Sequence, residues 1–128
     1  MLLDSTFLID DQRGTFRGRP RRAYGFLDAN PETLIQISVI TCGEIAEEFT
    51  EDRREAFEDL IRPYAVVEVT AQIAWRFGLL SRRLRESGER IGDNDLWIAA
   101  TALSHQVPLV SRDGSHFART PGLKLLTY

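Results

Sequence analysis

Residues 92–103 read Gly-Asp-Asn-Asp-Leu-Trp-Ile-Ala-Ala-Thr-Ala-Leu, in which two carboxylates lead directly into an almost wholly apolar segment. Asp93 or Asn94 suits the N-cap of a helix here, because a short polar side chain accepts hydrogen bonds from the first free N–H groups. After Asp95, apolar residues recur at i+3, i+4 and i+7, the spacing of one helix face. Asp95 is therefore expected to head a stripe that faces the core.

A carboxylate that faces the core is stable only in certain surroundings. Since an unpaired buried carboxylate is costly, Asp95 should be neutralised, hydrogen-bonded or close to a cation. The alternative is an exposed acidic helix start, which the helix dipole favours. This segment alone leaves both interpretations open.

The composition fits one globular domain spanning residues 1–128, with 43% hydrophobic and 27% charged residues. No apolar run reaches the roughly 20 residues needed to cross a bilayer, and no basic region precedes the apolar N-terminus, so a cytoplasmic protein is expected. The single cysteine, Cys42, excludes an internal disulfide and a multi-cysteine zinc site. His105 and His116 are too few for a histidine-rich site, so any metal would be held by oxygen.

The net charge of −3 means that nucleic-acid binding must depend on how the charges are distributed. The segment from Asp10 to Pro20 contains two glycines and a proline and is predicted to be a loop. With the residues just after it, this loop forms the best candidate patch for RNA phosphates, carried by Arg13, Arg17, Arg19, Arg21 and Arg22. The alternative is a solvated loop that leads into a helix near residues 23–29.

Short apolar strands alternate with helical patterns along the chain. Strands are predicted near residues 1–3, 35–39, 107–110 and 123–126, with a strand or extended connector at 65–69. Helices are predicted after Thr41, after Thr70 and from Asn94. Such alternation implies parallel pairing, and hence a three-layer α/β/α sandwich with a central, mainly parallel sheet.

Parallel topology gathers residues that follow different strands along one sheet edge, where such folds bind ligands. Asp4, Glu44 and Asp113 lie at or shortly after predicted strands, and Asp95 begins a core-facing helix. Four carboxylates are therefore expected to converge. For Glu44 a purely structural role remains open, because Thr41-Cys42-Gly43-Glu44 also has the pattern of a capping box.

Four acids in one cleft stay ionised only if a cation offsets their repulsion, and Mg²⁺ or Mn²⁺ suits carboxylate oxygens. A divalent ion with open coordination positions can polarise a phosphate and activate water. The predicted chemistry is metal-dependent phosphodiester hydrolysis without a covalent intermediate.

Four segments in this order resemble the successive motifs of PIN-domain ribonucleases, and most closely those of the VapC-like toxins of bacterial toxin–antitoxin pairs. They are Leu3-Asp4-Ser5-Thr6-Phe7-Leu8-Ile9, Ser38-Val39-Ile40-Thr41-Cys42-Gly43-Glu44, Asp95-Leu96-Trp97-Ile98-Ala99-Ala100-Thr101-Ala102 and Ser111-Arg112-Asp113 followed by Phe117.

The resemblance implies an acidic metal site made by Asp4, Glu44, Asp95 and Asp113, with Thr6 and Ser111 in supporting positions. It further implies an RNA substrate, a homodimer and inhibition by a VapB-like antitoxin. The sequence departs from the family pattern at two positions. Thr6 is not the commonest residue at its position, and His116 stands where a further acid often occurs.

Other functions remain as alternatives. A haloacid-dehalogenase-type phosphatase would need a second acid two residues after Asp4, where this chain has Thr6, and its lysine partner is missing because Lys124 is the only lysine. A PIN-domain nuclease that is not a toxin, or a non-catalytic PIN-like RNA-binding module, remains possible. The presence of all four acids favours catalysis.

Overall fold

The computed structural model describes the backbone of residues 1–17, 22–112 and 114–128, and the side chains of residues 1–12, 25–112 and 114–128. Within these residues, five strands form one sheet in the order β3-β2-β1-β4-β5. Every neighbouring pair is parallel. The strands are β1 (Leu2–Leu3), β2 (Gln36–Ser38), β3 (Ala65–Val67), β4 (Leu109–Val110) and β5 (Leu125–Leu126).

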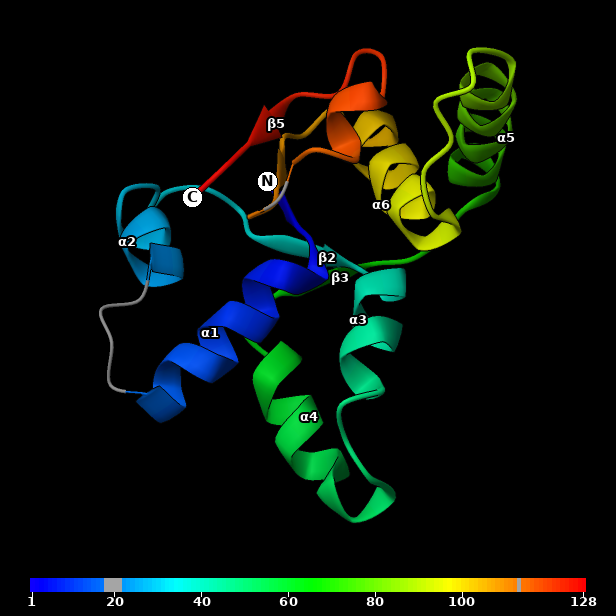
Figure 1. Ribbon diagram of the computed structural model, residues 1–128. Helices are drawn as coiled ribbons and strands as arrows, with labels where there is room; N and C mark the ends of the chain where they lie inside the picture. The colour runs from blue at the N-terminus through cyan, green and yellow to red at the C-terminus, as the bar shows by residue number, and fades with distance from the viewer. Residues whose placement is uncertain (18–21, 113) are drawn as a thin grey trace.

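Helices cover both faces of this sheet (Figure 1). α1, α3 and α4 lie on one side of the strands, and α5 and α6 lie on the other. The helices are α1 (Ser5–Arg17), α2 (Arg22–Asp28), α3 (Val39–Ala46), α4 (Arg54–Ile61), α5 (Ala71–Glu86) and α6 (Asp93–Ser104), with short 3-10 helices at Glu51–Arg53 and Phe117–Arg119.

The central strands divide their side chains between two cores. Leu3 and Val110 pack with Phe7 and Ile45 on the side of α1 and α3. Their neighbours Leu2 and Leu109 pack on the opposite side, against α6. This alternation follows from the two-residue period of a strand, and both strand faces are apolar because helices cover both. The predicted three-layer α/β/α architecture is confirmed.

One predicted loop is wrong. Residues 10–17 continue α1 instead of forming a loop. Gly14 costs a helix interior only about 1 kcal/mol, which burial of an apolar helix face can offset. Phe7 and Leu8 provide that burial, since both are fully enclosed in the core. Residues 18–21 lie outside the described part, and the predicted helix near 23–29 is found as α2.

The predicted capping box at Thr41 and Glu44 is also wrong. α3 begins two residues earlier, at Val39, and its N-cap is Ser38, whose Oγ accepts a hydrogen bond from the Ile40 N–H at 3.1 Å. The polar residue at the end of β2 therefore starts the helix, and Thr41 lies buried inside it. α3 ends at Ala46, and a separate helix, α4, follows.

The predicted cap is correct for α5 and wrong for α6. Thr70 caps α5 as predicted, and its Oγ1 accepts from the Ile73 N–H at 3.3 Å. α6 begins at Asp93 with Gly92 as N-cap, so neither Asp93 nor Asn94 is the cap. In the part of the chain that the structure describes, no helix has the length and apolar character needed to cross a membrane.

Candidate active site

Asp4 stands at the centre of the sheet's carboxyl edge. It follows β1 directly, and its backbone N–H donates to the Val110 carbonyl of β4 at 3.1 Å. The residue is only 4% exposed. A buried strand that ends in a carboxylate thus places a charge where the sheet opens, as the parallel topology predicts.

Three donors hold the Asp4 carboxylate in place. The Thr6 hydroxyl donates to Oδ1 at 2.6 Å, and the Phe7 N–H donates to the same oxygen at 3.3 Å. The Ser111 hydroxyl, just beyond β4, donates to Oδ2 at 2.6 Å. Thr6 and Ser111, which the sequence resemblance implied as supporting residues, therefore both contact Asp4.

Burial raises the pKa of Asp4 above its usual range. The hydrogen bonds from Ser111, Thr6 and Phe7 lower the pKa, but they do not cancel the effect of burial. The negative charge of Asp95 raises the pKa further. Asp4 and Asp95 are therefore close enough to repel one another, and a cation between them would relieve both the burial cost and the repulsion.

Asp95 lies in the first turn of α6, and its side chain is 32% exposed. Its Oδ2 is 3.4 Å from Nδ1 of His116. Leu96, Ile98 and Ala99, which follow it along the helix, are buried. α6 thus packs its apolar face on the sheet and leaves Asp95 half-buried at its start, beside His116.

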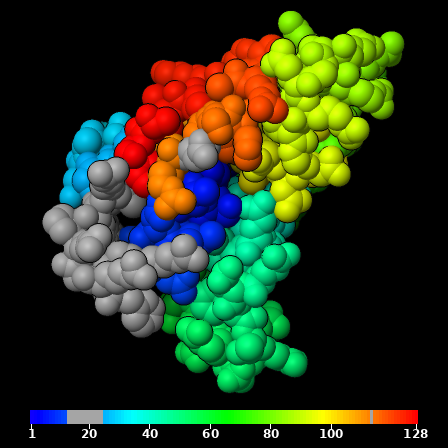
Figure 2. Space-filling view, in the orientation of Figure 1, coloured from blue at the N-terminus to red at the C-terminus, as the bar shows by residue number. Residues whose placement is uncertain are grey.

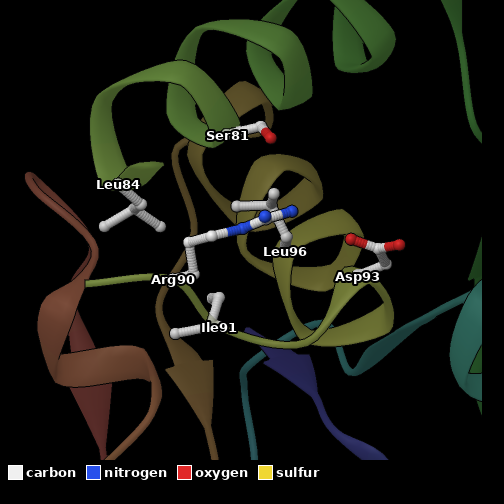
Figure 3. Close-up of a pocket in the computed structure, with 6 residues that line it drawn as sticks. All are labelled: Ser81, Leu84, Arg90, Ile91, Asp93 and Leu96. Carbon is white, nitrogen blue, oxygen red and sulfur yellow. The ribbon is translucent and has the colours of Figure 1, made fainter. Parts of the chain in front are cut away.

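Asp93 has different surroundings, although it is only two residues away. It is exposed and lines a small pocket between α5 and the start of α6. Figure 3 shows Asp93 and Arg90 beside Leu96, with Ser81 and Leu84 of α5 facing them. This pocket does not include Asp4 or Asp95, so the two neighbouring aspartates serve separate parts of the surface.

Glu44 is half-buried on α3, a helix that contacts both α1 and α6. Among the described side chains, no group of three His, Cys, Asp or Glu residues lies close enough together to hold a metal ion. Of the predicted acids with described side chains, Asp95 acts on Asp4 through its charge, and Glu44 does not complete a three-acid group with them. Asp113 lies outside the described residues.

The arginines of the predicted RNA patch fall at the limits of the described structure. Arg13 and Arg17 lie on the backbone of α1 and Arg22 on that of α2, but their side chains are not described. Arg19 and Arg21 lie outside the described residues altogether.

A second set of polar contacts at this edge was not predicted. The Arg112 N–H donates to the Thr6 Oγ1 at 3.3 Å, and Arg112 Nη1 lies 2.7 Å from Asp10 Oδ1. The Tyr128 hydroxyl donates to the other Asp10 oxygen at 2.9 Å. Burial, together with this hydrogen bond, raises the pKa of Tyr128. No local sequence signal marks these contacts, because they join residues more than 100 positions apart.

The site opens on one face of the molecule. Figure 2 shows the surface of the N-terminal residues in a hollow, bordered by α3, the start of α6 and the segment after β4. These are the elements that carry Glu44, Asp95 and Ser111.

The sequence model of the PIN-domain family matches residues 1–123 of this chain. The chain belongs to the PIN-domain family. Among its relatives, ribonuclease VapC10 of Mycobacterium tuberculosis is 34% identical over 125 residues, covering 97% of this chain and 90% of the relative.

Solved structures share the fold of this PIN domain. VapBC-1 from nontypeable Haemophilus influenzae superposes with a TM-score of 0.79 at 25% identity, over 98% of this chain and 96% of the other. VapBC2 from Rickettsia felis, bound to a promoter DNA fragment, gives a TM-score of 0.82 at 22% identity, over 99% of this chain and 97% of the other. The second similarity concerns the fold alone.

The donor chemistry of this PIN domain suits a hard divalent cation. Asp4 and Asp95 offer carboxylate oxygens, the ligands that Mg²⁺ and Mn²⁺ prefer. Burial and the negative charge of Asp95 both disfavour the charged form of Asp4 in the absence of a cation. These residues therefore fit a metal ion.

Proposed function

We propose that this PIN domain is a metal-dependent ribonuclease that hydrolyses RNA phosphodiester bonds, and that it is the toxin of a toxin–antitoxin pair. The observation that carries the proposal is the buried Asp4 carboxylate, fixed by Thr6 and Ser111 within reach of the charge of Asp95. The relatives named ribonuclease VapC support the ribonuclease activity, and the structural neighbours named VapBC support the pairing with an antitoxin.

Asp4 and Asp95 would hold Mg²⁺ or Mn²⁺, and we propose Glu44 and Asp113 as further carboxylates of the same site. When bound, the ion would supply Lewis-acid chemistry, polarising a phosphodiester and activating water. The Thr6 and Ser111 hydroxyls both donate to Asp4, and we propose that they orient this carboxylate while hydrolysis proceeds directly, without a covalent intermediate.

The protein's own contribution is to hold the carboxylates still. Asp4 has donors on both oxygens, so its orientation is fixed before substrate arrives. Asp95 is held by the first turn of α6 and faces His116. Such preorganisation stabilises a transition state because the polar groups need not reorient during the reaction.

The RNA and protein partners are part of the same proposal. We propose that Arg13, Arg17, Arg19, Arg21 and Arg22 contact RNA phosphates, and that a VapB-like antitoxin occupies the acidic face. A homodimer is also proposed. Large apolar side chains exposed along β3 and α5 provide a candidate dimer surface, formed by Val66, Val69, Trp75 and Leu79.

RNA cleavage by purified protein tests the proposal. Cleavage should require Mg²⁺ or Mn²⁺, stop when EDTA is added and be abolished in Asp4→Asn. Cleavage that persists in EDTA would exclude the metal mechanism. A protein that binds RNA without cleaving it, with either metal, would instead be a non-catalytic RNA-binding module. Growth arrest on expression, relieved by the protein encoded beside it, would distinguish a toxin from another PIN-domain nuclease.

A further inference from the structure

A chain of polar contacts runs from α1 to the last residue of the chain, beside the proposed site. Asp10 lies at its centre, with Arg112 on one carboxylate oxygen and Tyr128 on the other. We propose that Asp10 is a positioning residue for RNA hydrolysis. It fixes the Ser111–Arg112 segment against α1 and thereby fixes the donors that hold Asp4. The inference rests on the proposed ribonuclease function.

α1 holds residue 112 at two points. Thr6 and Asp10 are four residues apart and so lie on the same face of α1. Thr6 accepts the Arg112 backbone N–H, while Asp10 binds the Arg112 side chain. Because α1 contacts both the backbone and the side chain of Arg112, the Ser111–Arg112 segment has little freedom to move along the helix.

The contacts of residue 112 with α1 are linked to Asp4 through Thr6 and Ser111. The hydroxyl that accepts the Arg112 N–H is the same one that donates to Asp4 Oδ1 at 2.6 Å. Ser111, the residue before Arg112, donates to Asp4 Oδ2, also at 2.6 Å. If Arg112 shifts, Ser111 shifts with it and the Thr6 hydroxyl loses its backbone donor, so both hydroxyl contacts to the buried carboxylate are disturbed.

The other half of the chain of contacts keeps Asp10 in place. Tyr128 donates to Asp10 Oδ2, and its ring packs edge-on against Phe7 with centroids 4.9 Å apart. Phe7 is fully buried and its N–H is one of the Asp4 donors. Asp10 itself is 24% exposed, whereas the Arg112 side chain is 57% exposed. Asp10 is therefore the more enclosed partner and serves as the anchor.

An exposed arginine beside an acidic site has an alternative role, which is to bind the phosphates of RNA directly. The two roles predict different kinetics. A positioning residue acts on the orientation of the carboxylate and lowers kcat, whereas a phosphate contact that is equally strong in the ground and transition states raises KM. They also differ in a double-mutant cycle, because residues acting through one contact show non-additive effects.

The experiment compares Asp10→Asn, Arg112→Gln, the double variant and Tyr128→Phe, which removes the hydroxyl and keeps the ring. Glu58→Gln is the matched control, since it breaks an exposed Arg54–Glu58 pair of 2.8 Å on α4. Two quantities are measured: kcat and KM for RNA cleavage, and the hydrogen exchange rate of the Arg112 amide by NMR.

We expect Asp10→Asn to lower kcat by about tenfold or more with KM within about twofold, because small misplacements of catalytic groups are costly. The Arg112 amide should exchange faster, the double variant should be no worse than the poorer single variant, and Tyr128→Phe should change kcat in the same direction by less. Glu58→Gln should match wild type.

Three results would overturn the proposal: an unchanged kcat and amide exchange rate in Asp10→Asn, a rise in KM alone, or independent losses that multiply in the double variant. If the wild-type protein does not cleave RNA, the proposed function fails separately. In that case the amide exchange decides: faster exchange in Asp10→Asn supports the positioning role, and unchanged exchange overturns it.

Discussion

Asp93 and Asp95 are alike in composition but differ in environment, and this difference predicts which of them matters for catalysis. Asp95 faces His116 and influences Asp4, whereas Asp93 is exposed beside Arg90. Asp95→Asn should abolish RNA cleavage and leave the fold intact, because Asn keeps the shape of the side chain. Asp93→Asn should retain most activity, since Gly92 and not Asp93 caps the helix.

The measurement is metal-dependent RNA cleavage by both variants, with circular dichroism to verify folding. Each variant is the control for the other, because both remove one charge from the first turn of α6. An inactive Asp93→Asn beside an active Asp95→Asn would contradict the assignment of the site.

Asp4 gives a prediction about stability and pH. Burial raises its pKa in the folded state above the unfolded value, so the folded state binds the proton more tightly. This stabilising effect is complete below the unfolded pKa and is lost as pH rises through the folded pKa. In EDTA, Asp4→Asn should therefore match wild type near pH 3 and become more stable than wild type as pH rises toward about 7.

Denaturant unfolding of both proteins across this pH range measures the difference. Asn is a suitable reference because it resembles the protonated acid in shape and does not titrate. A stability advantage of wild type that grows with pH would show that the hydrogen bonds from Ser111 and Thr6 outweigh burial.

At the scale of single elements, the start of α3 changes how Glu44 is tested. Since Ser38 caps the helix, Glu44 has no capping role to lose. Glu44→Gln should change the free energy of unfolding by no more than about 0.5 kcal/mol, as expected for a substitution away from caps and core. RNA cleavage should fall if Glu44 belongs to the metal site, as we propose.

Thermal unfolding and RNA cleavage of the same preparation separate the two effects. Ser38→Ala is the matched control, because it removes the cap at the same helix and should destabilise the protein by about 1 kcal/mol. Normal cleavage by Glu44→Gln would exclude the residue from catalysis.

The elements also show what the sequence predicts well. The strand before Asp4, the cap at Thr70 and the apolar stripe of α6 each depend on a local pattern, and each is found. The loop predicted after Asp10 is wrong because Gly14 marks a break only where packing does not compensate for it. The start of α3 was misplaced because Ser38 and Thr41 are both good caps, and only the end of β2 decides between them.

At the scale of the molecule, parallel topology predicts that Asp4, directly after β1, lies at the carboxyl edge of the sheet, and the core-facing start of α6 brings the charge of Asp95 near enough to raise the pKa of Asp4. Glu44 shows the limit of this argument. Topology brings its helix beside α6 but does not set the distance between side chains. The contact of Asp10 with Tyr128 could not be predicted, because the two residues are 118 positions apart and their contact depends on the path of the chain after β5.

The exposed apolar residues of β3 and α5 predict how two copies associate. Trp75 is 71% exposed and belongs to the candidate dimer surface. Trp75→Glu should convert a dimer into a monomer without loss of folding, because a charge there opposes burial in an interface. Leu34→Glu is the matched control, since Leu34 is 66% exposed but lies outside that surface. Sedimentation velocity distinguishes the outcomes, and a Trp75→Glu dimer would place the interface elsewhere.

Metal binding should stabilise the whole molecule, because a cation offsets the cost of burying the charged Asp4 carboxylate. A ligand that binds only the folded state at about 100 times its Kd adds about 2.7 kcal/mol to the free energy of unfolding. Mn²⁺ should therefore raise the melting temperature of the wild-type protein, and EDTA should reverse the rise.

The same titration identifies the residues responsible without any need for RNA. Asp4→Asn and Asp95→Asn should lose most of the Mn²⁺-dependent rise, since each removes a proposed ligand. Asp93→Asn should keep the Mn²⁺-dependent rise in melting temperature. It also removes a charge from the first turn of α6, but Asp93 lines a pocket that does not include Asp4. An equal rise in all four proteins would mean that the ion binds elsewhere. A loss confined to Asp4→Asn and Asp95→Asn would tie the metal to the sheet edge, where burial and the charge of Asp95 already disfavour an uncompensated charge on Asp4.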